Sequence, residues 1–221
     1  MIVHKDQLDL FRLISSIIKA DIVCYAFGGT AMMFYGYKDQ TKDIDLLFGT
    51  EADRKEFIKA IEILGYKETS PIKIYIPAKL KDKHAPIMYR RGESRFDLFV
   101  SKIFRTTISP RMKDALYSVH DFKGKHTLTI KVLKTEFIVL LKGITKREKD
   151  FEDILTIVKK EQDFDWQMLI DETIWQYMHK NEWALYDVER TLRELKKYVF
   201  IESNYLNQLY RTAEKKKKIK T

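Results

Sequence analysis

A glycine pair followed shortly by two alternating aspartates constrains the fold of this chain more than any other feature. The two segments read Phe27-Gly28-Gly29-Thr30 and Asp43-Ile44-Asp45-Leu46. Side chains two positions apart on a strand lie on the same face, so Asp43 and Asp45 point into the same space. Carboxylates held this close repel each other, and a divalent cation is the usual compensation. Glycines at the start of a helix offer backbone N–H groups to an anion, so the two segments together predict a nucleoside triphosphate with Mg²⁺.

A third aspartate, Asp97, lies in the apolar segment Arg95-Phe96-Asp97-Leu98-Phe99-Val100. A carboxylate in a buried strand needs a partner. If this strand lies beside the first two aspartates, three carboxylates converge and suit two Mg²⁺ or Mn²⁺ ions that bridge substrate phosphates. The expected chemistry is in-line attack of a hydroxyl on an α-phosphate, with loss of pyrophosphate. Asp97 is then the expected metal ligand on the nucleophile side and the best candidate for the general base.

Each of these residues also has a purely structural interpretation. The strand aspartates could lie on a solvated edge, and the glycine pair could only make a tight turn from strand to helix. Asp97 could form a buried ion pair with Arg95 or Arg90. The alternatives for the glycines are compatible with each other, because a tight turn at a helix start can still bind an anion.

The composition indicates a folded chain with a hydrophobic core. Of the 221 residues, 45% are hydrophobic and 13% are aromatic, which argues against disorder. No apolar run approaches roughly 18 residues, so we expect no membrane span, and the N-terminus lacks the layout of a signal peptide. The single cysteine, Cys24, lies in an apolar run. We expect it to be a small core residue of a protein in a reducing, cytoplasmic setting.

Positive charge is concentrated at the end of the chain. The formal net charge is +9, and Arg211, Lys215–Lys218 and Lys220 set against Glu214 account for +5 of it. The remaining charge is ordinary for a soluble domain. We expect residues 211–221 to form a basic, disordered, solubilising tail, and nucleic-acid binding is the alternative.

Hydrophobic periodicity divides the chain into a core at residues 1–133 and a helical region at residues 134–210 that packs on it. Strands are expected at Ile22–Phe27, Asp43–Phe48, Ile72–Ile76, Ile87–Arg90, Arg95–Val100 and Thr127–Val132. Helices of the core are expected at Asp6–Ala20, Thr30–Tyr35 and Ala52–Leu64. The predicted fold class is therefore α/β (α+β), a mixed β-sheet flanked by helices with a C-terminal helical region.

In order and spacing, the glycine pair, the Asp-x-Asp pair and the later strand aspartate resemble the nucleotidyltransferase superfamily related to DNA polymerase beta. The wider match, from Gly28-Gly29-Thr30-Ala31 through Tyr35-Gly36 to Thr41-Lys42-Asp43-Ile44-Asp45-Leu46, looks like the minimal and abortive-infection-type nucleotidyltransferases of bacteria and archaea. Lys142 and Lys149-Asp150 resemble a helical lysine and a following Lys-Asp pair in those families. The families' arginine just before the Thr-x-Asp element is absent here.

The resemblance implies a nucleotidyltransferase-like fold and a Mg²⁺- or Mn²⁺-dependent enzyme. Such an enzyme transfers a nucleoside monophosphate from an NTP, in the first place ATP, to a hydroxyl of tRNA, a protein or a small molecule. A toxin-like role in a toxin–antitoxin pair fits those families. The catalytic and metal-binding residues that the resemblance implies are Asp43, Asp45 and Asp97. The nucleotide-binding residues that it implies are Gly28, Gly29, Thr30 and Lys142.

A second hypothesis is a catalytically inactive nucleotide-binding or partner-binding module of the same fold. A sealed ion pair at Asp97 favours that module, whereas three carboxylates converging in an open cleft favour the enzyme. Lys142 could simply be solvated, and the acidic residues after Lys149 could form an ordinary charged helix face. Three tryptophans at helical spacing are expected in the core rather than on a base-stacking platform: Trp166, Trp175 and Trp183. The sequence leaves the oligomeric state open.

Overall fold

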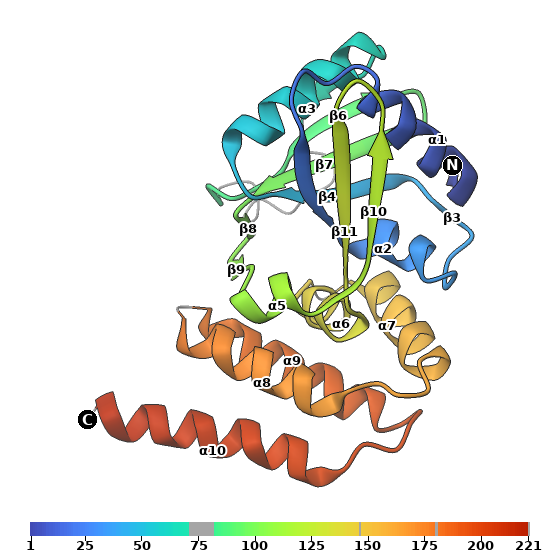
Figure 1. Cartoon of the computed structure of the whole chain (residues 1–221). Coiled ribbons are helices and arrows are strands. Elements are labelled where there is room, and N and C mark those ends of the chain that lie inside the picture. The colour runs from blue at the N-terminus through green and yellow to red at the C-terminus, as the bar shows by residue number, and fades with distance from the viewer. Residues whose placement is uncertain (71–81, 146, 180, 221) are drawn as a thin grey trace. The chain divides into compact units, whose positions relative to one another are not determined.

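The chain forms two compact units in a computed structural model that describes residues 1–70, 82–145, 147–179 and 181–220 (Figure 1). The first, here called the sheet unit, comprises Met1–Ile108 and Met112–Leu133. The second, the helical unit, comprises Ser109–Arg111 and Lys134–Thr221. The short helix α5 (Pro110–Asp114) crosses the division.

The sheet unit is built on one mixed β-sheet, in which nine strands are paired among the described residues. Its main strands, in spatial order, are β10 (Leu116–Lys123), β11 (Thr127–Leu133), β2 (Ile22–Ala26), β4 (Asp43–Phe48), β7 (Ser94–Val100), β6 (Ile87–Arg91) and β5 (Lys67–Thr69). Two short strands, β8 (Lys102–Ile103) and β9 (Thr106–Thr107), continue the sheet beyond β7. The short strands β1 (Ile2–Val3) and β3 (Gln40–Thr41) pair only with each other. The pairs β11–β2 and β4–β7 are parallel, and the other neighbours along the main path are antiparallel. The predicted mixed sheet is therefore confirmed.

One face of the central strands forms the core of the sheet unit. Ile44, Leu46 and Phe48 of β4 are fully buried, as is Phe96 on β7. Because strand side chains alternate between the two faces, the aspartates at the odd positions of β4 must lie on the opposite face. The strand sequence thus buries its apolar side and presents its carboxylates on the other.

Three helices belong to the sheet unit. α1 (His4–Ser15) and α3 (Glu51–Ile63) pack on the sheet, and α2 (Gly28–Phe34) starts beside the carboxylate face. α3 begins after Thr50, whose hydroxyl caps the helix by accepting the Asp53 N–H at 3.1 Å. Its Phe57 ring packs against the rings of Phe48 and Phe96, so α3 covers the apolar face of β4 and β7.

The helical unit contains five helices among its described residues. They are α6 (Thr135–Gly143), α7 (Glu148–Lys160), α8 (Trp166–Met178), α9 (Glu182–Leu195) and α10 (Ser203–Lys220). Every residue of α6 is buried, so this helix is the centre of the unit. The predicted C-terminal helical region is thereby confirmed. In the part of the chain that the structure describes, no helix is long and apolar enough to cross a membrane.

Several described elements are not among those expected from the sequence: the short strands β1, β3, β5, β8 and β9, the short helix α5, and β10. β10 was not expected, because alternate positions in its sequence mix polar and apolar residues, which is common on an edge strand that buries little. The basic tail from residue 211, expected to be disordered, is part of α10. The strand expected at Ile72–Ile76 lies outside the described residues.

Candidate functional site

The glycine pair forms the turn from β2 into α2. Gly28 has a φ of +57°, a left-handed conformation that favours glycine. A Cβ atom built on Gly28 would overlap Asp45 Oδ2 and would lie 3.0 Å from Asp45 Cγ. Any side chain at this position would therefore displace the carboxylate, so the backbone of the turn approaches Asp45 as closely as it does only because residue 28 is glycine.

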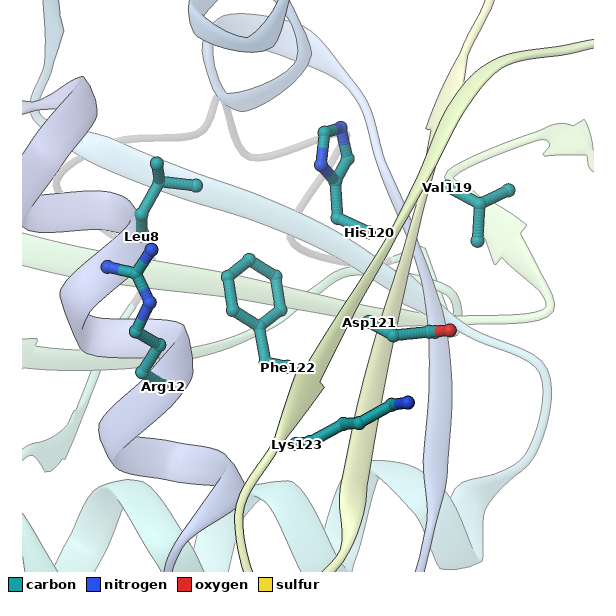
Figure 2. Close-up of a pocket in the computed structure, with 7 residues that line it drawn as sticks. All are labelled: Leu8, Arg12, Val119, His120, Asp121, Phe122 and Lys123. Atoms are coloured by element: carbon teal, nitrogen blue, oxygen red, sulfur yellow. The ribbon is translucent and has the colours of Figure 1, made fainter.

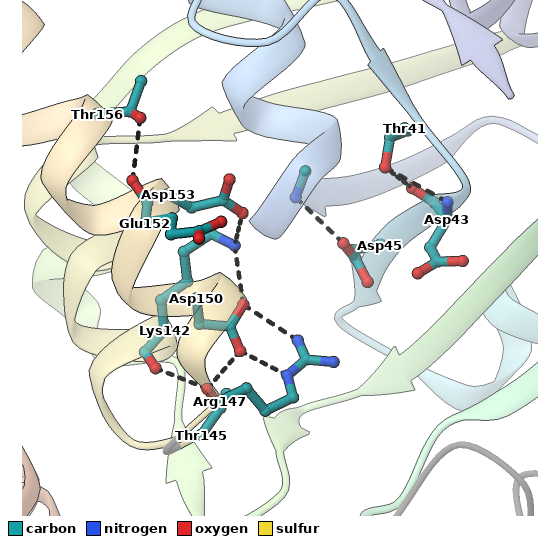
Figure 3. Close-up of polar contacts among 11 residues, drawn as sticks. Thr41, Asp43, Asp45, Lys142, Thr145, Arg147, Asp150, Glu152, Asp153 and Thr156 are labelled. Carbon is teal, nitrogen blue, oxygen red and sulfur yellow. Dashed lines mark hydrogen bonds and ion pairs between the residues drawn. The ribbon is translucent and has the colours of Figure 1, made fainter.

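The residues after Gly28 hold Asp45 in place. The Gly29 N–H donates to Asp45 Oδ2 at 3.3 Å, the dashed line that ends at Asp45 in Figure 3. The Asp45 N–H donates to Thr30 Oγ1 at 2.8 Å. Thr30 is fully buried. Its hydroxyl thus fixes the backbone of β4. Gly29 is also closely packed, because a Cβ atom at this position would lie 2.7 Å from Thr41 Oγ1.

Strand register brings the three predicted aspartates onto one face of two adjacent strands. In the parallel β4–β7 pair, Asp45 is opposite Asp97 and Asp43 is opposite Arg95. Residues that are opposite each other on neighbouring strands share a face, and the strands lie about 4.8 Å apart. The condition that the sequence analysis stated for convergence, adjacency of the two strands, is therefore met.

Arg95 connects two of the three carboxylates. Its Nε donates to Asp97 Oδ1 at 2.6 Å and its Nη2 donates to Asp97 Oδ2 at 3.1 Å, a two-pronged contact. The same Nη2 lies 2.8 Å from Asp43 Oδ2. Asp97 is 1% exposed, whereas the Asp43 side chain is 35% exposed. The ion-pair interpretation of Asp97 is thus confirmed, with Arg95 as the partner.

The arrangement can hold a divalent cation only after a rearrangement. No group of three or more His, Cys, Asp or Glu side chains within the described residues is arranged to hold a metal ion. Three carboxylates are the hard oxygen donors that Mg²⁺ prefers, so the donor set has the right chemistry. The Arg95 guanidinium, however, already pairs with both Asp43 and Asp97. A metal ion at these carboxylates would have to take over that role from Arg95.

Lys142, predicted to bind the nucleotide, belongs to the helical unit and is held there by acidic residues. Its Nζ donates to Asp150 Oδ1 at 3.1 Å and to Asp153 Oδ2 at 2.6 Å (Figure 3). Arg147 and Thr145 also donate to Asp150. The Lys142 side chain is 8% exposed and that of Asp150 is 4% exposed. Asp150 is therefore buried and Asp153 is 15% exposed in an ion-paired cluster, whereas Lys149 and Glu152 on the same helix are exposed.

The charge of Asp150 is stabilised within this cluster. Burial raises the pKa of Asp150, but the hydrogen bonds from Arg147 and Thr145 and the charge of Lys142 outweigh it, so the net shift of the pKa is downward. The cluster thus contains matched charges with short hydrogen bonds.

A separate cavity lies between α1 and the edge strand β10. Its volume is about 460 Å³, and Figure 2 shows His120 and Phe122 pointing toward α1 and Asp121 pointing to the other side of β10. None of the three predicted aspartates lines it. The cavity is lined by Leu8, Arg12, Val119, His120, Asp121, Phe122 and Lys123.

Comparison with known proteins finds similarity among solved structures. No family model matches the chain, and a search of the curated proteins finds no match. Among solved structures, the chain is similar to the crystal structure of ANT(2")-Ia in complex with adenylyl-2"-tobramycin, with 14% sequence identity and a TM-score of 0.45. The similarity covers 70% of this chain and 88% of that chain.

Sequence analysis missed the positioning residues of the site. Thr41, whose hydroxyl accepts from the Asp43 N–H at 3.4 Å and donates to the Asp43 carbonyl at 3.1 Å, shapes the entry into β4. Arg95 was considered only as a partner of Asp97, and its contact with Asp43 was not foreseen. The period of two in Arg95-Phe96-Asp97 could have revealed it, because it places the arginine on the same face as the aspartates.

Proposed function

We propose that this chain is a divalent-metal-dependent nucleotidyltransferase that transfers a nucleoside monophosphate from an NTP, in the first place ATP, to a hydroxyl acceptor. The acceptor classes that we propose are tRNA, a protein side chain or a small molecule. The observation that carries the proposal is the register of β4 and β7, which places Asp45 opposite Asp97 on the face that Gly28 approaches. A chance Asp-x-Asp strand would not need a glycine pressed against one of its carboxylates.

The residues divide into metal ligands and groups that position them. Asp43, Asp45 and Asp97 would hold Mg²⁺ or Mn²⁺, which when bound would neutralise the triphosphate and activate the attacking hydroxyl. Asp97, buried and fixed by Arg95, is the candidate acceptor of the hydroxyl proton. Gly28 and Gly29 keep the α2 turn close enough for backbone N–H groups to face phosphate oxygens. Thr30 fixes the strand that carries Asp45.

One observation favours the second candidate, a catalytically inactive nucleotide-binding or partner-binding module. Arg95 pairs with both Asp43 and Asp97, which is the sealed state expected of a module that no longer uses a metal. The two candidates differ in one measurable respect. In the enzyme a metal ion replaces Arg95 as the partner of Asp43 and Asp97, whereas in the inactive module Arg95 stays paired with them.

Ligand-induced stabilisation followed by nucleotide transfer tests the proposal. ATP with Mg²⁺ should raise the melting temperature, because a ligand that binds the native state stabilises it, by about 2.7 kcal/mol at ~100 times its Kd. Transfer of label from α-³²P-ATP to total RNA, to protein or to small molecules of a cell extract then identifies the acceptor. Asp45→Asn should remove both signals.

The matched control is Asp121→Asn, which changes an exposed aspartate on β10 of the same sheet. It should keep both the ATP response and the transfer. An ATP response that survives Asp43→Asn and Asp45→Asn would exclude these residues as the metal site. A response without any transfer to any of the three acceptor classes would support the inactive module.

A further inference from the structure

The carboxylate face of the sheet continues into a row of cations. The strands β4, β7 and β6 follow one another in the sheet (Figure 1), and β5 pairs with β6 at its edge. Asp43 lies opposite Arg95, Arg95 lies opposite Arg90, and Arg90 lies opposite Lys67. Residues that are opposite each other on neighbouring strands share a face. These four residues therefore form one line across four strands, in which three cations follow one carboxylate.

The contacts of the neighbouring residues on β6 confirm this face. The Tyr89 hydroxyl donates to Glu62 of α3 at 2.9 Å, and Arg91 Nη1 donates to the Leu64 carbonyl at the end of α3 at 2.6 Å. Both side chains thus lie on the apolar face of the sheet, which α3 covers. Because strand side chains alternate, Arg90, which lies between Tyr89 and Arg91, is on the carboxylate face.

The two outer cations of the row are exposed and carry unmatched charge. Arg90 Nε donates to the Gly92 carbonyl at 2.7 Å, a contact with its own hairpin turn. In the part of the chain that the structure describes, neither Arg90 nor Lys67 is paired with an acidic side chain. Glu68, the acidic neighbour of Lys67 on β5, lies on the α3 face, and Glu93 is exposed in the turn. The row therefore presents two cations to an anion outside the chain.

The row lies on one particular side of the carboxylate site. Under the proposed function, the glycine turn faces the NTP phosphates beside Asp45 on β4, and Asp97 on β7 accepts the proton of the attacking hydroxyl. β6 and β5 follow β7 on the side away from β4. Since neighbouring strands lie about 4.8 Å apart, the backbones of Arg90 and Lys67 lie roughly 5 and 10 Å beyond β7. The cations are thus on the acceptor side of Asp97, away from the NTP.

We propose that Arg90 and Lys67 bind the phosphates of a nucleic-acid strand whose terminal hydroxyl is the acceptor. Phosphodiesters supply a series of anions, and the arginine fork matches a phosphate. The hydroxyl oxygen forms a bond to the α-phosphorus of the NTP, the bond to the leaving pyrophosphate breaks, and Asp97 takes the hydroxyl proton. The role of the strand as acceptor rests on the proposed function, whereas its binding rests on the row alone.

The other two acceptor classes fit the row less well. A small molecule that carries amino groups would be repelled by Arg90 and Lys67. An acidic protein segment could pair with the cations, but its hydroxyl would have to come from a separate side chain. A nucleic-acid strand carries the anions and the terminal hydroxyl together.

Fluorescence anisotropy with the full chain tests this inference, in EDTA and without NTP, so that metal and nucleotide play no part. The probes are fluorescein-labelled oligouridine and oligothymidine of about 12 nucleotides, within the ~4–16 that a single-strand site occupies. Arg90→Gln/Lys67→Gln should weaken binding by roughly 10- to 30-fold at ~0.1 M salt. It should also reduce the log–log salt slope by about 1.4, which corresponds to two phosphate contacts on a single strand. The two probes distinguish RNA from DNA as the source of the strand.

The matched control is Arg91→Gln/Lys55→Gln. Arg91 is the next residue on β6 but lies on the α3 face, and Lys55 is exposed on α3. The control lowers the net charge of the chain by the same amount, and it should bind both probes as the unchanged chain does. Circular dichroism checks that each variant is folded. If Arg90→Gln disturbs the hairpin, Lys67→Gln alone should still reduce the salt slope by about 0.7.

A further pair of measurements separates this inference from the proposed function. Asp45→Asn should keep the difference between the two double variants, so an inactive transferase leaves the binding result readable. If the unchanged chain transfers a nucleotide to the strand, Arg90→Gln/Lys67→Gln should raise the KM for the strand and leave the KM for ATP unchanged.

Four outcomes would overturn the inference. The first is that neither strand binds to the full chain. The second is equal binding by the two double variants. The third is an oligoglutamate of the same length that binds as tightly as the strands, because the row would then accept any polyanion. The fourth is transfer to the strand with an unchanged KM in Arg90→Gln/Lys67→Gln, because the row would then lie off the acceptor path.

Discussion

The two units each contain a cluster of aspartates and a buried cation, and the clusters differ in how completely their charges are matched. In the helical unit, Lys142 and Arg147 face Asp150 and Asp153, so the formal charges of the named groups cancel. In the sheet unit, Arg95 contacts Asp43 and Asp97, and together with Asp45 these four side chains have a formal net charge of −2.

The second difference is the backbone next to the carboxylates. Asp150 receives side-chain donors from Lys142 of α6 and from Thr145 and Arg147 in the turn before its own helix. Asp45 receives the Gly29 N–H, at a turn where a Cβ on Gly28 would overlap it. A cluster that only stabilises the fold needs no such clearance. Under the proposed function, the helical cluster stabilises the fold and the sheet cluster binds a ligand cation.

The largest expected effect comes from removing the cation of each cluster. Arg95→Met and Lys142→Met each remove a cation that is paired with a buried carboxylate, Asp97 or Asp150, and each should lower the free energy of unfolding by about 3–5 kcal/mol in EDTA. Mg²⁺ should then restore about 2–3 kcal/mol to Arg95→Met at ~100 times its Kd, because the metal replaces the guanidinium. It should restore nothing to Lys142→Met. Urea unfolding followed by circular dichroism measures both.

This pair of variants separates the two candidate functions as well as the two clusters. The unfolding free energy of each variant is compared in calcium-free buffer with Mg²⁺ and in the same buffer with EDTA. The unchanged chain, measured in both buffers, is the reference. Equal behaviour of Arg95→Met in the two buffers would show that the sheet cluster is as structural as the helical one, and the inactive module would then be the better description.

A smaller effect is expected at the glycine turn. Gly28 and Gly36 both have positive φ, +57° and +70°, so alanine at either position costs about 1–2 kcal/mol in backbone strain. Nothing lies within 4 Å of a Cβ on Gly36, whereas a Cβ on Gly28 overlaps Asp45. Gly28→Ala should therefore lose about 1–3 kcal/mol more than Gly36→Ala and should lose its response to ATP with Mg²⁺.

The double variant Gly28→Ala/Asp45→Ala isolates the overlap, because removing the carboxylate removes the clash. Its stability should return to that of Gly36→Ala, apart from the hydrogen bond between Gly29 and Asp45. Equal losses for Gly28→Ala and Gly36→Ala would mean that the turn relaxes freely and that Gly28 serves only to permit its φ angle.

The sequence predicts the sheet cluster better than the helical one for a physical reason. Period-two alternation places Asp43 and Asp45 on one face whatever the rest of the chain does, and Asp97 needs only strand adjacency to join them. Whether Lys142 meets Asp150 and Asp153 depends on how α6 and α7 pack, which no local pattern specifies. Trp183 was expected in the core but is 56% exposed, because helical spacing gives a face but does not say whether another helix covers it.

The smallest expected effect is a difference in pH dependence between two buried carboxyls of the helical unit. The pKa of Asp150 is lowered on balance, so its contribution to stability is complete above its ordinary pKa and is lost as the pH falls through the lowered value. Glu172 behaves in the opposite way. Burial raises its pKa, although Gln176 and Ser109 donate hydrogen bonds to it at 2.8 Å each.

Because the folded protein holds the proton of Glu172 more tightly, stability should be greatest below the ordinary pKa of a glutamate and should fall as the pH rises through the raised value. Glu172→Gln keeps an amide that can bond to Ser109 but cannot ionise, so it should gain stability relative to the unchanged chain as the pH rises from 4 to 7. Asp150→Asn should instead lack the part of the fall in stability at acidic pH that protonation of Asp150 causes. Urea midpoints measured from about pH 2 to pH 7 test both, because the decline due to Asp150 lies below the ordinary pKa of an aspartate. Parallel profiles for Glu172→Gln and the unchanged chain would show that the surroundings of Glu172 stabilise its charged form as well as its protonated form.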